Sequence, residues 1–528
     1  MIGRPSGIAD HLEQYRQPIV RSVGSTASEQ YLATLADRTF LNLWSYPNPY
    51  REQKLLGGSD GKELCDLLVV CDPHIIVFSE KHIGWPDRPI EVAWPRWFKK
   101  AVGAAAKQLR GAERWIAEFP DRIFLDRACS VPFPLKFPPA ERRKVHRVIV
   151  ANGAANACRD HFGGGIGTLL IKPDVVGDHH WDTKSPNHIP FAIGDIEPNG
   201  DFVHVLDEAS LDVLMLELDT ISDFTDYLDK RSAFLRSGRL AAAHGEEDLL
   251  AYYATNINES GDHDFVPPDG KSWEDVEAIA LGPRYGSFVR NPRYIAKKRA
   301  DEVSYAWDRL IETFTQHMLG GTSIVVPGQV YSLTNSEMAV RYMALESRFK
   351  RRSHSEAILG ALKRGETEQV FFRAMIAPAE ARYCETGFFF MTLKFMPWME
   401  ADGGYEKYRL LRTFYLKTYA QALLVKFPYL KRVVGIAMEP PNQGRGGSED
   451  CIYAAQAEWT DAELTEINDD CERLSIMKSL VPREYGGDEF PQVERERLSR
   501  PSNKFEGNRK ERRARAAAAK ALQRNKKF

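Results

Sequence analysis

Cysteine is scarce in this chain and shows no pairing pattern. Seven cysteines occur among 528 residues, at positions 65, 71, 129, 158, 384, 451 and 471, and none has a C-x-x-C or other metal-knuckle spacing. The odd count and wide spacing predict reduced thiols in a reducing compartment. They argue against a disulfide framework and against a zinc finger.

Long apolar runs are missing too. No stretch approaches the roughly 20 apolar residues that a membrane span needs, and the start of the sequence, MIGRPSGIADHLEQYRQPIV, lacks the apolar region of a secretory signal. There is no G-x-S-x-G motif, no catalytic Cys–His signature and no phosphate-binding loop with a Walker lysine. We therefore expect a cytoplasmic protein outside these enzyme classes.

The chain also lacks a surplus of charge of either sign. It has 71 lysines and arginines against 73 aspartates and glutamates, a net charge of −2. A polyanionic partner would have to bind a local basic patch. Hydrophobic residues make up 43% of the chain, which is ordinary for globular proteins and sufficient for buried cores.

Apolar patterning divides the chain into four parts. We expect an α/β fold in which an N-terminal mixed sheet flanked by helices is followed by α+β domains. The last part is a basic tail whose final 25 residues hold ten Lys/Arg against two Glu, and it is either a solvated end or a nucleic-acid-binding arm. The expected parts are residues 1–160, 161–300, 301–490 and 491–528.

A β-hairpin is predicted inside the first part. The runs LCDLLVVC (64–71) and HIIVFSEK (74–81) are separated only by Asp72-Pro73, a turn dipeptide. Side chains alternate faces along a strand, so Lys81 and Glu80 point to opposite sides of the sheet. Asp66 is an acid in an otherwise apolar run, where it needs a cation or a metal. Lys81, on the neighbouring strand, is a suitable partner.

These residues resemble a known nuclease family. An acid in the first turn of a predicted helix (Glu29, in 28–43), then E-x-x-D at the opening of a strand, then a strand that ends near a lysine resemble the PD-(D/E)xK core. The similarity is closest to the Mrr-like and NERD-like branches and covers about 150 residues. It implies a restriction-endonuclease-like fold with Mg²⁺ or Mn²⁺ held by Asp66, Lys81 as the catalytic lysine, and Glu29 as a supporting metal ligand.

The sequence departs from the family pattern at one position. Ser79 stands two residues before Lys81, where the family has Asp or Glu. Two neighbouring acids are alternatives: Glu63, three residues before Asp66, as a metal ligand, and Glu80 as a catalytic acid if a bulge turns it toward the site. Without such compensation the site is weak or inactive.

A strongly amphipathic helix is predicted over residues 93–120, next to this hairpin. Its basic residues Lys99, Lys100 and Lys107 are candidates for phosphate contacts, although an ordinary solvated helix face explains them equally well. Some branches of the resembling family place a glutamine near the site, and Gln108 is the candidate. The later runs RIFLDRACS and VHRVIVANG are predicted to complete the sheet.

The sequence favours a metal-dependent nuclease, an endonuclease rather than an exonuclease, that acts on DNA in preference to RNA. By analogy alone, it resembles prokaryotic antiviral-defence effectors, with a protein partner or a second copy bound through the C-terminal regions. The alternative is a non-catalytic nucleic-acid-binding or scaffold protein with a degenerate site. A third hypothesis is an unrelated enzyme centred on the polar loop 439–453. The glycine-rich segment 161–167 predicts only a connector.

Overall fold

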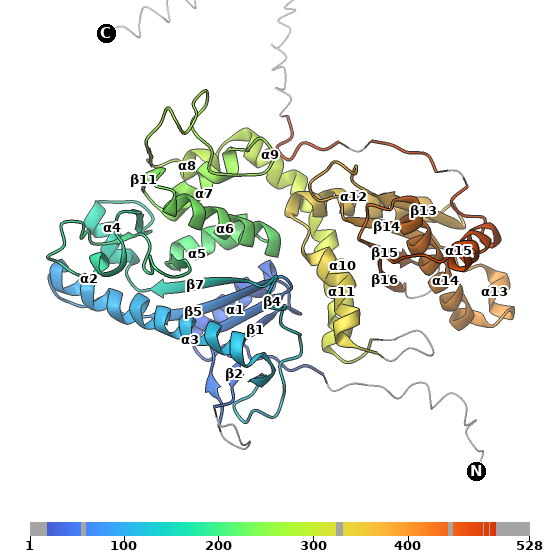
Figure 1. Ribbon diagram of the computed structural model, residues 1–528, viewed down its shortest axis with the longest axis horizontal. Helices are drawn as coiled ribbons and strands as arrows, with labels where there is room; N and C mark the ends of the chain where they lie inside the picture. The colour runs from blue at the N-terminus through green and yellow to red at the C-terminus, as the bar shows by residue number, and fades with distance from the viewer. Residues whose placement is uncertain are drawn as a thin grey trace, which may run out of the picture.

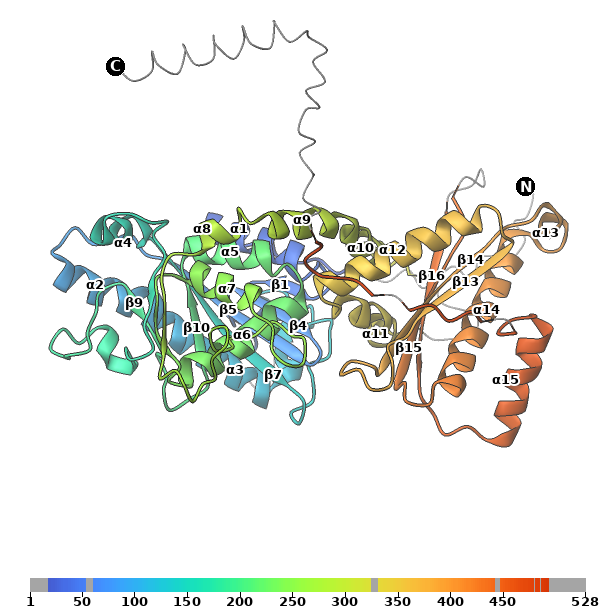
Figure 2. The same cartoon turned by 90° about the horizontal axis from the view of Figure 1, so that it is seen from above.

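The computed structural model describes residues 18–53, 60–323, 331–441, 447–478, 480–484 and 486–492. Figure 1 shows a larger lobe built from the N-terminal and middle residues, a smaller C-terminal lobe, and a group of helices between them. The same division is visible from above in Figure 2. Of the predicted basic tail, only its first two residues belong to the described part of the chain.

A five-stranded mixed sheet forms the centre of the larger lobe, in the order β1-β4-β5-β7-β10. β1, β4 and β5 are antiparallel neighbours, whereas β5, β7 and β10 run parallel. The predicted hairpin is confirmed as β4 and β5. The boundary expected at residue 160 falls within this sheet, because β10 pairs with β7. The strands are β1 (Ser45–Pro47), β4 (Leu67–Cys71), β5 (His74–His82), β7 (Lys144–Asn152) and β10 (Val203–Leu206).

Helices cover both faces of this sheet (Figure 1). Alternate residues of β5 enter two separate cores: Phe78 packs with α1, α5 and α6, and Val77 packs with α2 and α3. The single helix expected over 93–120 is interrupted, because a π-helical turn, η1, separates α2 from α3. The elements are α1 (Ala27–Thr39), α2 (Ile90–Phe98), η1 (Lys99–Gly103), α3 (Ala104–Glu118), α5 (Glu208–Glu217) and α6 (Ile221–Arg236).

A small three-stranded sheet, β3-β2-β6, lies beside the main one. The run RIFLDRACS was expected in the main sheet, and that prediction is wrong: β6 pairs with β2 instead. A period-two pattern identifies a strand but not its partner, which long-range contacts choose. The strands are β2 (Tyr50–Arg51), β3 (Lys62–Glu63) and β6 (Ile123–Phe124), preceded by the 3₁₀ turn η2 (Pro120–Arg122).

The middle residues add a four-stranded sheet, β12-β11-β8-β9, and short helices to the same lobe. Its helix α7 begins three residues after the end of β11, with His244 and Gly245 between the two elements. The elements are α4 (Ala155–Phe162), β8 (Leu170–Ile171), η3 (Gly177–His180), β9 (Ala192–Ile193), β11 (Leu240–Ala243), α7 (Glu246–Thr255), β12 (Ile279–Leu281), α8 (Tyr285–Phe288) and α9 (Pro292–Asp301).

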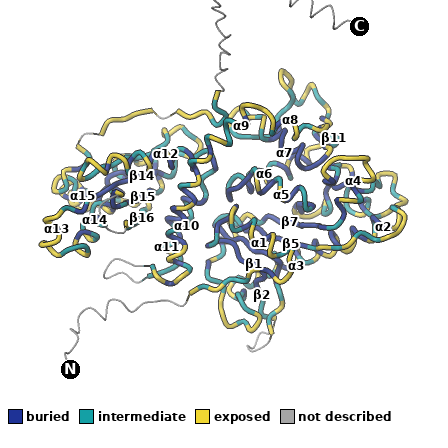
Figure 3. The backbone as a smooth tube through the Cα atoms, turned by 180° about the vertical axis from the view of Figure 1, so that it is seen from behind, coloured by how far each residue is buried: buried dark blue, intermediate teal, exposed yellow. Residues whose placement is uncertain are grey.

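The helices between the lobes are held by buried ion pairs as well as by apolar contacts. Arg351 is fully buried and donates to Asp308 at 2.7 Å, and Arg348 binds the same carboxylate at 2.8 Å. Figure 3 shows how much of these helices is buried between the lobes. They are η4 (Glu302–Ser304), α10 (Tyr305–Leu319), α11 (Leu333–Ala344) and α12 (Arg348–Gly365).

The C-terminal lobe has its own four-stranded mixed sheet, β13-β14-β15-β16, packed against α14. The chain is therefore a mixed α/β protein with several mixed sheets flanked by helices. Within the described ranges, no helix is both long enough and apolar enough to cross a bilayer. The elements are β13 (Val370–Met375), β14 (Thr386–Leu393), α13 (Pro397–Ala401), α14 (Gly404–Lys426), β15 (Arg432–Met438), β16 (Glu449–Ala455) and α15 (Asp461–Arg473).

Candidate functional site

Asp66 lies at the entrance to β4 and collects donors from β5. Its backbone N–H donates to the carbonyl of Phe78, so the antiparallel pairing places it beside Ser79, Glu80 and Lys81. Its Oδ2 accepts from the Glu80 backbone N–H at 2.5 Å, Lys81 Nζ at 3.0 Å and Ser79 Oγ at 3.2 Å. Asp66 is only 5% exposed, and these donors compensate for burying its charge.

Lys81 is held in place at the end of β5. Besides Asp66, its ammonium group donates to the carbonyl of Glu80 at 2.7 Å. The side chain is 27% exposed, so the cation is anchored by protein and still open to solvent. The two residues that the sequence places at the centre of the site are thus in direct contact.

Gln108 reaches this pair from α3, on the face of the sheet that Ser79 and Lys81 share. Ser79 Oγ lies 2.9 Å from Gln108 Oε1, and Gln108 Nε2 lies 3.5 Å from Asp66 Oδ1. Ser79 is fully buried, so its hydroxyl serves to join the strand to the helix. The structure thus brings Gln108 within hydrogen-bond distance of both Ser79 and Asp66.

Glu29 and Glu63 approach the same place through Asn48, a residue that the sequence reasoning missed. Asn48 Nδ2 donates to Glu29 Oε2 at 2.9 Å and to Glu63 Oε1 at 2.8 Å, while its backbone N–H donates to the Asp66 carbonyl at 3.0 Å. Asn48 is 1% exposed and has a positive φ of 48°, which asparagine tolerates better than most residues. Its position between two prolines, in Pro47-Asn48-Pro49, was the signal available in the sequence.

The local electrostatics follow from burial and crowding of carboxylates. Burial raises the pKa of Glu63, and the nearby charges of Asp66 and Glu29 raise it further, while Asn48 and Lys81 act in the opposite direction. Repulsion among ionised carboxylates of this kind is relieved when a cation binds between them. The acids of this cluster therefore favour a positively charged ligand.

Glu80 does not join the cluster on the Lys81 side. β5 keeps a regular register with β4 and β7, without the bulge that would turn Glu80 around. Its side chain instead accepts from Asn152 Nδ2 at 2.6 Å on the opposite face of the sheet. Burial raises the pKa of Glu80, which Asn152 and Ser28 partly offset. The prediction that a bulge turns Glu80 toward Asp66 and Lys81 is wrong, because side chains alternate regularly along β5.

The basic residues expected to contact phosphate lie on the exposed side of the α2–α3 segment. Lys99, Lys100 and Lys107 are exposed, and Lys99 Nζ lies 5.9 Å from the centre of the Trp181 ring. Lys107 immediately precedes Gln108 in the sequence of α3, so an exposed ammonium group lies next to the residue that contacts Asp66.

The donor set suits a hard divalent cation. Asn48 engages one oxygen of Glu29 and one of Glu63, which leaves the second oxygen of each carboxylate unused by these bonds. Mg²⁺ prefers oxygen ligands and keeps several waters, so it does not need a closed protein shell. Asp66, Glu29 and Glu63 are spread more widely than the ligands of a compact metal site. Among the described residues, the three-residue group whose possible ligand atoms all lie within 4.8 Å of one another is a different one: His244, Glu247 and Asp248.

The third hypothesis placed a polar loop at 439–453, of which the structure describes 439–441 and 447–453. The last five residues, 449–453, belong to strand β16, and Asp450 there is an ion-pair partner of Arg412, at 2.5 Å. Arg412 is fully buried and also donates to Ser448 Oγ at 2.8 Å. These polar groups therefore stabilise the C-terminal lobe, and Arg445 lies outside the described residues.

The geometry groups an acid, an ammonium and a glutamine at one sheet end, with two more acids behind an asparagine. Such a set can hold a cation and stabilise developing negative charge on a phosphate. No family model, no curated protein and no solved structure matches the chain. The functional argument therefore rests on the site itself.

Proposed function

We propose that this chain is a metal-dependent nuclease of the PD-(D/E)xK kind that cleaves DNA, with its site at Asp66 and Lys81. One observation carries the proposal: Lys81 Nζ lies 3.0 Å from Asp66 Oδ2 at neighbouring strand ends, in a cluster that includes Gln108, Glu29 and Glu63. The mixed sheet flanked by helices is the setting that the family resemblance implies. A role in prokaryotic antiviral defence rests on analogy alone.

Each side chain has a part in this proposal. Bound Mg²⁺ or Mn²⁺, held by Asp66 with Glu29 and Glu63 in support, would supply Lewis-acid activation of water and neutralisation of phosphate charge. Lys81, oriented by Asp66, donates to the attacking water or to a phosphate oxygen as negative charge develops. Gln108 positions Asp66, and the exposed Lys99, Lys100 and Lys107 hold the phosphate backbone.

A second candidate function is supported by Ser79. A fully buried serine occupies the position of the family's second acid, so the site has one carboxylate fewer on β5 than the pattern requires. In that case the chain is a non-catalytic protein that binds nucleic acid through the basic helix. Metal dependence separates the two functions, because binding alone does not need Asp66 to hold a cation.

The test is cleavage of supercoiled plasmid, linear duplex, single-stranded DNA and RNA with Mg²⁺, with Mn²⁺ and with EDTA. We expect metal-dependent nicking of DNA by the wild type and a loss of at least about a hundredfold in Lys81→Ala, the size typical of removing one transition-state donor. Lys363→Ala, an exposed lysine on α12, is the matched control and should cleave normally. Binding of DNA by wild type and Lys81→Ala alike, without cleavage under any metal, would instead establish the binding protein.

A further inference from the structure

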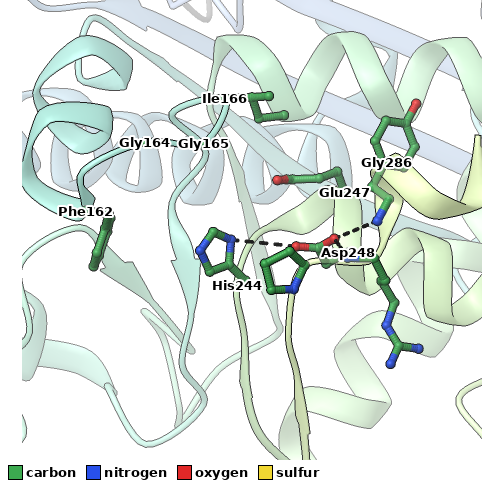
Figure 4. Close-up of a pocket in the computed structure, with 11 residues that line it drawn as sticks. Phe162, Gly164, Gly165, Ile166, His244, Glu247, Asp248 and Gly286 are labelled. Carbon is green, nitrogen blue, oxygen red and sulfur yellow. Dashed lines mark hydrogen bonds and ion pairs between the residues drawn. The ribbon is translucent and has the colours of Figure 1, made fainter. Parts of the chain in front are cut away.

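A second cluster of ligand-type side chains lies in the middle residues, away from Asp66. His244 is in the turn after β11, and Glu247 and Asp248 are in the first turn of α7. One possible ligand atom from each lies within 4.8 Å of the other two. Figure 4 shows the three side chains gathered at the wall of a pocket.

Backbone donors fix the orientation of Asp248. Its Oδ1 accepts from the backbone N–H of Arg284 at 2.6 Å and of Tyr285 at 2.8 Å, at the start of α8. The other oxygen, Oδ2, is directed toward His244 Nδ1 at 3.7 Å. Asp248 is 3% exposed, so this carboxylate is preorganised rather than a mobile surface acid.

Glu247 supplies the observation that points to a ligand. The residue is 7% exposed, and Thr168 Oγ1 donates to its Oε1 at 3.0 Å, while Oε2 is buried without a hydrogen-bond partner. A buried oxygen that lacks a partner is uncommon in folded proteins and calls for a physical reason, such as a bound ion. A cation between Glu247, Asp248 and His244 would supply that partner.

The cluster is closely packed on one side and open on the other. A Cβ on Gly245 would lie 2.4 Å from the Glu247 carboxylate and from Thr168 Oγ1, so a larger residue there would displace these side chains. The cluster opens onto a cavity of about 500 Å³, which Phe162, Gly165 and Ile166 line from the other side. Protein ligands would hold the ion on one side, with the cavity available for water or a further ligand.

We propose that His244 Nδ1, Glu247 Oε2 and Asp248 Oδ2 form a binding site for a first-row divalent cation such as Zn²⁺. An imidazole combined with two carboxylates suits Zn²⁺ or Mn²⁺, whereas Mg²⁺ and Ca²⁺ favour all-oxygen sets. Three protein ligands leave a coordination position toward the cavity, so the ion is accessible. The site does not depend on the nuclease proposal, because it shares no residue with the Asp66 cluster.

The test is Zn²⁺ binding to the metal-stripped full chain, by titration calorimetry and by metal analysis after gel filtration. We expect the wild type and Asp66→Asn to bind one Zn²⁺ per chain. We expect His244→Gln to bind Zn²⁺ more than about tenfold more weakly, because even the loss of a group outside the ligand shell can lower metal affinity by that factor. His161→Gln removes another exposed histidine near the pocket and should bind normally. His244 is 47% exposed, so its replacement should leave the fold intact, which a thermal melt checks.

Glu247→Gln provides a second, independent variant. It keeps an acceptor for Thr168 but loses the charge, so Zn²⁺ should again bind more weakly by more than about tenfold. Equal Zn²⁺ affinity in wild type, His244→Gln and Glu247→Gln would overturn the proposal, as would a wild-type chain that binds no Zn²⁺. Loss of Zn²⁺ binding only in Asp66→Asn would also overturn it, since the ion would then belong to the other cluster.

Discussion

Asp66 receives its donors from three consecutive residues of β5, one through its backbone and two through their side chains. These donors compensate for burying the Asp66 carboxylate, and charge-assisted hydrogen bonds are stronger than neutral ones. It also holds Lys81, which is 27% exposed, in one orientation toward solvent. At the scale of residues, the site is preorganised around Asp66.

Replacing Ser79 shows what the serine contributes at the position where the family pattern has Asp or Glu. We expect Ser79→Ala to lower the free energy of unfolding by about 1 kcal/mol, since a buried hydroxyl bonded to Asp66 and Gln108 is lost. Cleavage should fall by no more than roughly tenfold, because the hydroxyl positions Asp66 rather than meeting substrate. Urea denaturation and a plasmid-nicking assay measure the two effects. A loss of cleavage as large as in Lys81→Ala would mean that Ser79 itself contacts metal or substrate.

At the scale of elements, β5 and α3 decide which polar groups meet. The regular register of β5 sends Ser79 and Lys81 to the face covered by α3 and sends Glu80 to the face covered by α1. The π-helical turn η1 lies where the α2–α3 segment passes β5 and β7. The helix buries its apolar side and leaves Lys107 in solvent beside Gln108.

Lys107 should act on binding rather than on chemistry. We expect Lys107→Ala to weaken binding of any DNA sequence and to reduce the slope of log K against log[salt] by about 1, the value for one phosphate contact. Fluorescence anisotropy measures this slope when the salt concentration is varied between about 50 and 200 mM. Lys363→Ala serves as the surface-lysine control, and an unchanged slope in Lys107→Ala would remove this residue from the interface.

At the scale of the molecule, the five-stranded sheet extends beyond the predicted N-terminal part, residues 1–160. β10 supplies its edge beyond β7, so Val203 and Val205 pack in the same core as Ile149. We expect a chain cut after residue 160 to be insoluble or unfolded, because it exposes the β7 edge and the apolar groups that α5 covers. Solubility and far-UV circular dichroism test this. A cooperative thermal transition in the shortened chain would contradict it.

The described segment 486–492 lies against the larger lobe, beside α9 (Figure 2). Glu489 accepts from His263 Nε2 at 2.9 Å and lies 3.4 Å from Lys297 Nζ. Burial would raise the pKa of Glu489, but the bond and charge of His263, together with Lys297, hold it at about 2. Burial would likewise lower the pKa of His263, yet Glu489 raises it.

These shifts set a pH window for the attachment. The Glu489 contribution is complete above its ordinary pKa of 4.5 and is lost as pH falls toward about 2. The His263 contribution is complete below 6.5 and is lost as pH rises through its raised value. Glu489→Gln should therefore loosen the segment most between pH 4.5 and 6.5, by up to about 3 kcal/mol. Limited proteolysis at pH 3, 5.5 and 8 measures this, with the exposed Glu484→Gln as control.

Local pattern was sufficient to determine the hairpin, the helix with Glu29 in its first turn and the contact between Asp66 and Lys81. These features depend on strand alternation and on a short turn between segments that are neighbours in the sequence, so they form without contacts between distant parts of the chain. Contacts across long separations were decided only by the tertiary structure: Asn48 between Glu29 and Glu63, β10 beside β7, and β6 in the small sheet. A sequence pattern shows which face of an element is apolar, but packing of distant elements selects its partners.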